Sequence, residues 1–137
     1  MTSSFSGIDI GRTGIGFAHH WIDTIGHNLA NLNDVTATDA EPFRARFLVA
    51  QEVTGDVFAA TGSGVGIARI EADQRDPITT YDPNHPLADE QGNVNRPAVD
   101  LAGQLTDLTI ANRTYQANAR QISGAREAYE SALRIGE

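Results

Sequence analysis

A regular spacing of apolar residues at the two ends of the chain limits its possible folds more than any other feature. In the first third, apolar or small residues recur at alternating steps of three and four, which is the spacing of a coiled-coil seam. The series is Ile8, Gly11, Ile15, Ala18, Ile22, Ile25, Leu29 and Leu32. A helix of about 25 residues would be about 37 Å long, which is too long to cross a globule of this size. We therefore expect this helix to need a long partner.

Glycine weakens the same stretch. Five glycines fall in or beside the N-terminal seam, at positions 7, 11, 14, 16 and 26. Each is about 1 kcal/mol less favourable than alanine within a helix, so the deficit is about 5 kcal/mol. We expect this helix to be frayed until something packs against it.

The last third carries a matching seam with better helix formers. Its members are Leu101, Leu105, Leu108, Asn112, Tyr115, Ala119, Ile122, Arg126, Tyr129 and Leu133. Asp100 is a suitable N-cap, and Gly136 is suited to follow the last helical turn. Asn112 and Arg126 are polar seam residues, which usually fix register or partner choice. The sequence predicts a long C-terminal helix.

Between the seams the apolar period changes to two, which predicts short strands near residues 43–49 and 65–71. Turn-forming residues follow, in particular at 82–86 and 91–93. The predicted fold is therefore mainly α with a small β-rich insert. Its parts are an N-terminal coiled-coil helix (1–33), a loop and small β-rich insert (34–98) and a C-terminal coiled-coil helix (99–137). Long terminal helices of this kind would pack as a coiled coil completed by neighbouring subunits.

Composition excludes several classes of protein. A length of 137 residues fits one domain. The net charge is -8 and all ten basic residues are Arg, which argues against nucleic acid as a partner. The absence of Cys removes disulfides, thiolate nucleophiles and Cys-ligated zinc. Neither a cleaved signal peptide nor a membrane-spanning segment is expected, because polar residues and glycine interrupt every apolar run.

Few side chains have the pattern of a catalytic or metal site. His19, Asp23 and His27 fall at i, i+4 and i+8, so they share one side of a helix and could in principle bind a metal. His20 lies elsewhere on that helix and is not expected to join them. No fourth ligand is implied. We therefore expect no catalytic, cofactor-binding or metal site and no small-molecule substrate, and we interpret the three residues as subunit contacts.

Three runs resemble the bacterial flagellar rod and hook protein family. The first, at the end of the N-terminal helix, consists of Asn28, Leu29, Ala30, Asn31 and Asn33. The second resembles a stretch typical of the proximal rod subunits in that family, and its residues are Asp82, Pro83, His85, Pro86, Ala88, Asp89 and Gly92. The third, within the C-terminal helix, includes Arg113, Tyr115 and Asn118. The similarity runs in order along nearly the whole chain.

The resemblance implies a structural subunit of the proximal rod, the drive shaft that spans the periplasm. Its partners would be copies of itself, other rod subunits and the flagellar type III export apparatus, with no insertion into a membrane. The residues expected to form the assembly seam are Ile15, Ile22, Ile25, Leu29, Leu101, Leu105, Leu108, Tyr115, Ile122 and Tyr129. Two alternatives remain: a small soluble coiled-coil adaptor, or a metal-binding module or small enzyme using His19, Asp23 and His27.

Overall fold

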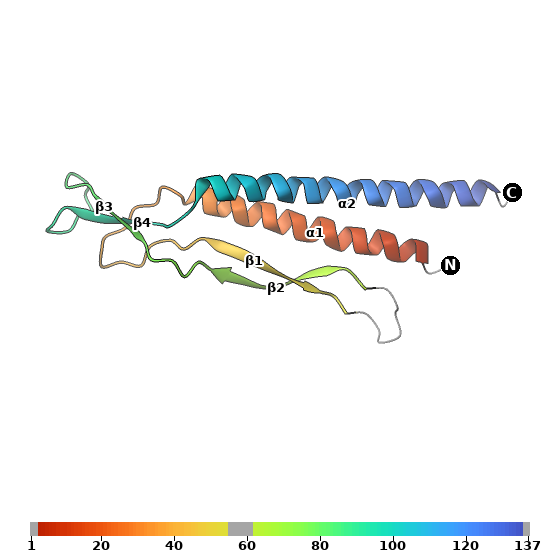
Figure 1. The fold of residues 1–137 in the computed structure, drawn as a ribbon, viewed down its shortest axis with the longest axis horizontal. Helices are drawn as coiled ribbons and strands as arrows, with labels where there is room; N and C mark the ends of the chain where they lie inside the picture. The colour runs from red at the N-terminus through yellow and green to blue at the C-terminus, as the bar shows by residue number, and fades with distance from the viewer. Residues whose placement is uncertain (1–2, 55–61, 136–137) are drawn as a thin grey trace.

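Two long antiparallel helices form the body of the protein. The computed structural model describes residues 3–54 and 62–135, in which α1 spans Ser3–Ala30 and α2 spans Leu101–Ile135. The helices lie side by side, and both ends of the chain are at the same end of the molecule (Figure 1). About half of the chain is helical, as predicted. Gly136 lies outside the described residues.

Polar side chains mark the helix boundaries next to the central insert. The Asp100 carboxylate accepts a hydrogen bond from the Ala102 amide at 3.1 Å, which confirms the predicted N-cap of α2. At the end of α1, the Asn31 side chain donates to the His27 carbonyl at 2.8 Å. The same carbonyl also accepts the Asn31 backbone amide at 3.3 Å, so both groups of Asn31 hold the last turn of the helix.

A β-hairpin runs beside α1. Its strands are β1 (Arg46–Glu52) and β2 (Val65–Ala72), paired antiparallel from Arg46 opposite Ala72 to Glu52 opposite Val65. The register shifts between Val49 and Ala50, which is a β-bulge. Both strands were expected from the sequence, although β1 begins and ends three residues later than predicted.

A second small sheet lies at the end of the molecule away from the termini (Figure 1). It pairs β3 (Ile78–Tyr81) with β4 (Asn93–Arg96), and Thr36 extends it through reciprocal backbone hydrogen bonds with Asn95, both 2.9 Å. We call this region, residues 34–41 and 76–100, the end lobe. Neither strand is expected from the sequence, in which strong turn signals at 82–86 and 91–93 stand beside both.

The buried core is small. Among the described residues the buried apolar side chains are Ala18, Ile25, Ala45, Val94 and Ala111. Many larger apolar side chains remain exposed on α2 and on the strands. No described helix has the length and apolarity to span a bilayer. A core of this size leaves most of the apolar surface of the helices available for other contacts.

Candidate functional site: the helix pair and its apolar flank

Glycine brings the two helices close together. A Cβ atom added at Gly11 would lie 2.8 Å from Cγ1 of Ile122, and one added at Gly14 would lie 2.6 Å from Cγ of Asn118. Real Cβ atoms do not approach other heavy atoms so closely, so both positions need glycine for this packing. By contrast, a Cβ at Gly7, Gly16 or Gly26 would meet nothing within 4 Å. The sequence indicated that glycine lowers the stability of this helix. It did not show that Gly11 and Gly14 allow the two helices to approach closely.

The face that α2 turns toward α1 is made mainly of small and polar residues, apart from Ile122 opposite Gly11. It includes Gln104 and Ala111, both buried, and Asn118, each one position before a predicted seam residue. Because one residue corresponds to about 100° of rotation around a helix, the α2 face that meets α1 is turned away from the predicted seam. The large apolar residues Leu101 and Leu105 consequently stay about half exposed, at 47% and 48%. The close approach at Gly14 places Asn118 against α1 in place of a large apolar side chain, in keeping with this rotation.

A buried polar junction joins α1, β1 and α2. Asn28 is only 1% exposed. Its carboxamide donates to the Arg46 carbonyl at 2.8 Å and to Oε1 of Gln104 at 2.9 Å, and it accepts from the Arg46 amide at 2.8 Å. The Asn28 side chain thus pairs with the first residue of β1 as a neighbouring strand would. This junction fixes where the chain leaves α1, enters β1 and returns in α2.

A threonine attaches the far end of the hairpin to α1. The Thr13 hydroxyl donates to the Ile10 carbonyl at 2.7 Å and accepts from the Val65 amide at 3.1 Å. Gly64, beside it, has φ +112° and sits directly against the Thr13 side chain, so both its conformation and its close approach require glycine. The hairpin is therefore held to α1 at both ends, by Asn28 and by Thr13.

The predicted seam residues gather along one side of the helix pair. On α1, Thr13 and Phe17 turn toward the hairpin. The half-buried residues Ile15, Ile22 and Leu29 lie on the opposite side of α1 from the hairpin, next to the residues that face α2. Helical geometry places the exposed stripe of α2 on that same side. We call this surface the apolar flank. Its members are Ile15, Ile22, Leu29, Leu101, Leu105, Leu108 and Tyr115, whereas Ile122, also expected in the seam, packs against Gly11 of α1.

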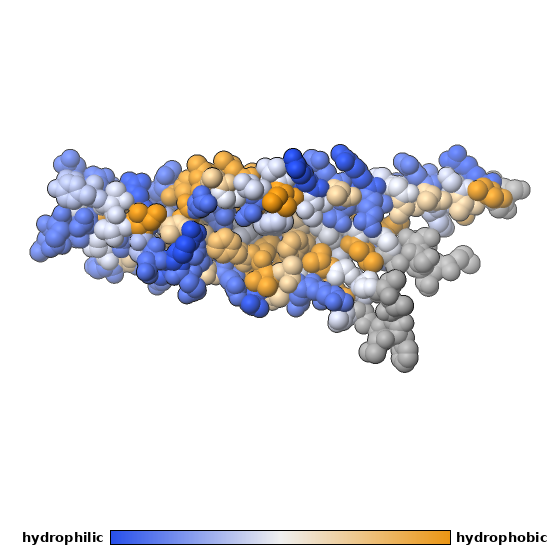
Figure 2. Space-filling model, in the orientation of Figure 1, coloured by the Kyte–Doolittle hydropathy of each residue, from blue (hydrophilic) through white to orange (hydrophobic). Residues whose placement is uncertain are grey.

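The apolar flank is incomplete within a single chain. Leu101, Leu105 and Tyr115 are between 40% and 48% exposed, whereas Ile25, also expected in the seam, is buried at 2%. Tyr129 continues the α2 stripe and is 43% exposed. Hydrophobic residues gather over the first turns of α2 in the space-filling view (Figure 2). A long apolar surface of this kind is typical of a protein interaction site.

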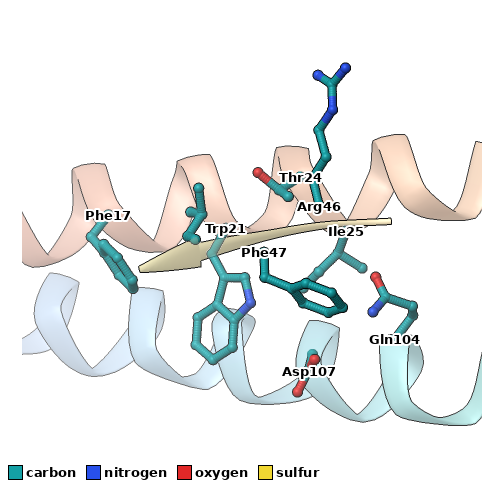
Figure 3. A pocket seen from close by; sticks show the side chains of 9 residues that line it. Phe17, Trp21, Thr24, Ile25, Arg46, Phe47, Gln104 and Asp107 are labelled. Atoms are coloured by element: carbon teal, nitrogen blue, oxygen red, sulfur yellow. The ribbon is translucent and has the colours of Figure 1, made fainter. Parts of the chain in front are cut away.

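An aromatic groove lies between α1, β1 and α2. It encloses about 250 Å³, and Phe17, Trp21 and Phe47 line it together with Gln104 and Asp107 of α2 (Figure 3). The rings of Phe17 and Trp21 lie 6.1 Å apart between centroids. The lining consists mainly of apolar and aromatic surface, and its polar groups lie beside the Asn28 junction. The groove is therefore better suited to contact another apolar surface than to carry out a reaction.

The histidines are arranged differently from the prediction. His20, expected to lie apart, lines a groove with Asp23 and His27, opposite Leu48, Ile67 and Ile70 of the hairpin. His19 forms an exposed contact with Asp23, 3.1 Å between Nδ1 and Oδ2. The His27 ring stacks on Phe43 with centroids 5.5 Å apart. No three His, Asp or Glu side chains in the described part of the chain are placed to hold one metal ion.

The motif at residues 82–92 forms the turn between β3 and β4. The Asp89 carboxylate accepts from the amides of Gln91 and Asn93 at 2.9 and 2.8 Å and from the Thr38 hydroxyl at 3.1 Å. The Asn93 amide is the main reason that the pKa of Asp89 lies below its ordinary value. His85 accepts from the Leu87 amide at 3.2 Å, and Gly92 has φ +80°. These motif residues stabilise a turn through local bonds.

The other motif residues have separate places. Asn31 completes the end of α1, and Asn33 is exposed just after it. Asn118 contacts α1, while Arg113 is exposed on α2. The Asp73 carboxylate pairs with Arg75, whose hydrogen bond lowers the pKa of Asp73. Sequence reasoning missed the roles of Asn28 with Gln104 and of Thr13 with Val65, because both join segments that are distant in sequence.

Comparisons with known proteins agree with these motifs. Residues 90–135 match a family model described as the C-terminal part of the flagellar basal body rod proteins FlgEFG. The chain is 33% identical to the flagellar basal-body rod protein FlgC of Escherichia coli O6:H1 over 94% of this chain and 95% of that protein. It is 32% identical to FlgC of Borreliella burgdorferi (96% of each) and 26% identical to FlgC of Bacillus subtilis (98% and 99%).

Proposed function

Because the chain belongs to the family of flagellar basal-body rod proteins FlgC, we propose that it is a structural subunit of the proximal rod. The rod is the drive shaft that crosses the periplasm, and its wall would contain the helix pair of this chain. A structural role in that family implies that the chain is not an enzyme.

The apolar flank is the single observation that carries this proposal. The two helices meet largely through small and polar residues and leave most of their larger apolar side chains on one side. In a tube wall, a helix of a neighbouring subunit would lie along that side and bury it.

Three parts would then have different duties in assembly. Residues 1–33 and 99–137 would form the packed helical wall with other copies and other rod subunits. Residues 34–98, with the hairpin and the end lobe, would add contacts outside that wall. Delivery would occur through the flagellar type III export apparatus, without cleavage of a signal peptide.

A charged residue on the apolar flank tests the proposal. Ile22→Asp and Leu108→Asp should leave export intact and abolish rod assembly, because a carboxylate buried among apolar side chains loses several kcal/mol of hydration. Leu105→Asp is the cleaner variant, since Leu105 is about half exposed in the single chain. Its matched control is Thr106→Asp, at the exposed neighbouring position whose hydroxyl bonds only to the Ala102 carbonyl.

The measurements are secretion of the chain, assembly of basal bodies and swimming. Leu105→Asp should be secreted and folded but give no rod, whereas Thr106→Asp cells should swim. Normal motility with Leu105→Asp would show that this flank is not an assembly surface.

A further inference from the structure

The aromatic groove between α1, β1 and α2 contains a buried donor group without an acceptor. Gln104 is only 5% exposed, and its Oε1 accepts the hydrogen bond from Asn28. The Nε2 group of Gln104 can donate two hydrogen bonds, but it has no acceptor among the described residues. Gln104 lines the groove. Because an unpaired buried donor is costly, this group is suited to meet an acceptor that comes from outside the chain.

One turn further along α2, Asp107 places an acceptor in the same groove. Its carboxylate is half-buried and makes no hydrogen bond or ion pair within the part of the chain that the structure describes. Residues three apart on a helix are neighbours on its surface, so the Gln104 donor and the Asp107 acceptor lie close together. Figure 3 shows both on the α2 side of the groove, beside the rings of Trp21 and Phe47. The groove thus combines aromatic walls with one donor and one acceptor.

The side chain that matches this arrangement is a phenol. A phenol hydroxyl donates to a carboxylate and accepts from an amide at once, and its ring packs against other aromatic rings. A phenylalanine side chain would leave both polar groups unpaired, and an arginine offers no acceptor to the Gln104 amide. The groove encloses about 250 Å³, less than the about 300–1,000 Å³ of small-molecule sites. Its size suits a single tyrosine side chain.

Tyr81 in the end lobe presents such a side chain to solvent. It is 72% exposed, whereas the other two tyrosines are 40% and 43% exposed. Tyr81 pairs with Asn93 at the end of β3, and a Cβ atom added at Gly92 would lie 2.9 Å from Cε2 of its ring. Gly92 therefore lets the ring rest against the turn, which holds it in place. Tyr81 does not line the groove of its own chain.

We propose that Tyr81 of one copy inserts into the aromatic groove of a second copy, where its hydroxyl donates to Asp107 and accepts from Gln104. The charged residues that line the groove are Arg46 and Asp107, whose charges cancel, so the acidic end lobe meets no net repulsion there. The contact joins two different surfaces of the chain, so it can repeat from copy to copy. It rests on the proposed structural role and adds a neighbour that the apolar flank does not specify.

Removal of one hydroxyl group tests the contact. The purified full chain should associate as its concentration rises in sedimentation velocity. Tyr81→Phe should weaken this association about tenfold, because Asp107 and Gln104 then lose their partner. Tyr115→Phe, which removes the hydroxyl of a tyrosine on the apolar flank, is the matched control and should associate normally. Equal association of the normal chain and Tyr81→Phe, or no association of the normal chain, would overturn the proposal.

Two groups of a single contact should not act independently. Asp107→Ala should also weaken association, and its combination with Tyr81→Phe should weaken it by less than the product of the two separate effects. Thr106→Ala, at the exposed neighbouring position, is the control and should have no effect. Effects that multiply would place the two residues in different contacts and refute the proposal.

A mixture of two variants identifies the surfaces. Tyr81→Ala keeps an intact groove and Asp107→Ala keeps an intact Tyr81, so an equimolar mixture should associate more tightly than either variant alone. Trp21, the one tryptophan of the chain, lines the groove, and its fluorescence should change as the complex forms. No gain in the mixture, with both variants folded by circular dichroism, would refute this contact. The role in the rod would still stand if Leu105→Asp blocked assembly, so the two proposals fail separately.

Discussion

The side-chain amides of Asn28 and Gln104 meet at 2.9 Å although 76 residues separate them in the chain. Both side chains are almost fully buried, at 1% and 5% exposure. Asn28 also makes both hydrogen bonds with the backbone of Arg46, so one side chain holds three segments in register. A buried amide with all its partners present specifies one arrangement, because any shift leaves several polar groups unpaired.

Replacing Asn28 by alanine should lower the free energy of unfolding by about 2–4 kcal/mol, since it leaves the Arg46 backbone and the Gln104 amide without their partners. Chemical denaturation monitored by circular dichroism measures this. Asn31→Ala is the control, because Asn31 makes its bonds at the exposed end of α1, and it should cost about 0.5–1.5 kcal/mol. Equal losses in the two variants would contradict the importance of the junction.

Two glycines of α1 should respond to alanine in opposite ways. Gly16→Ala adds a methyl group that meets nothing and should stabilise the chain by about 0.5–1 kcal/mol through helix propensity. Gly14→Ala pushes against Asn118 and should destabilise it by about 1–3 kcal/mol through overpacking. Thermal unfolding of both variants measures these changes in stability. Stabilisation by Gly14→Ala would mean that the helices are not in close contact there.

Stability of the end lobe should decline in acid. The hydrogen bonds that the Asp89 carboxylate accepts, first of all from the Asn93 amide, lower its pKa in the folded state. The stabilisation is therefore present above the pKa of an unfolded aspartate, about 4, and is lost as the pH falls through the lower folded value.

Hydrogen exchange of the β3 and β4 amides measures this loss. Asp89→Asn should reduce protection of these amides at neutral pH and flatten its dependence on pH in the acid range. Glu90→Gln, at the exposed neighbour, should keep the normal dependence. Identical acid profiles for normal protein and Asp89→Asn would show that another group is responsible.

The histidines of α1 should differ in their effect on stability. His19→Ala and Asp23→Asn should each change the free energy of unfolding by less than about 0.5 kcal/mol, because their pair is exposed. His27→Ala removes a ring stacked on Phe43 and should cost about 0.5–1.5 kcal/mol. Zinc or a chelator should leave the melting temperature unchanged. A rise in that temperature with zinc, abolished by His19→Ala with His27→Ala, would instead support metal binding.

The helices and the hairpin could be predicted because their signals are local. The seams repeat every three or four residues, and the N-cap at Asp100 and the alternation around Phe47 each lie within a few residues. Strands β3 and β4 were missed because each has only four residues beside strong turn signals, and because reciprocal bonds with distant Thr36 complete that sheet. Short strands depend on partners that a local pattern does not show.

The rotation of α2 could not be read from its apolar pattern. The pattern marks the most apolar side of a helix, and the intramolecular partner is expected there. In this chain Gly14 lies against Asn118, and Gln104 and Ala111 are the buried residues of α2, so most of its apolar side is left for the flank. Whether α1 or a neighbouring subunit covers the apolar side of α2 depends on the shape of the helix faces as well as on their hydrophobicity.

The antiparallel pairing of the first and last helices also sets the order in which the chain can fold. Gly11 and Ile122 touch although 111 positions separate them, whereas the strands of the hairpin pair within a short stretch. Loop closure over so long a segment is entropically costly, and non-local contacts of this kind form slowly. During synthesis α1 has no helix to pair with until the C-terminal third has left the ribosome. The unpaired chain therefore persists longest at its two ends, and the hairpin is the first part able to form.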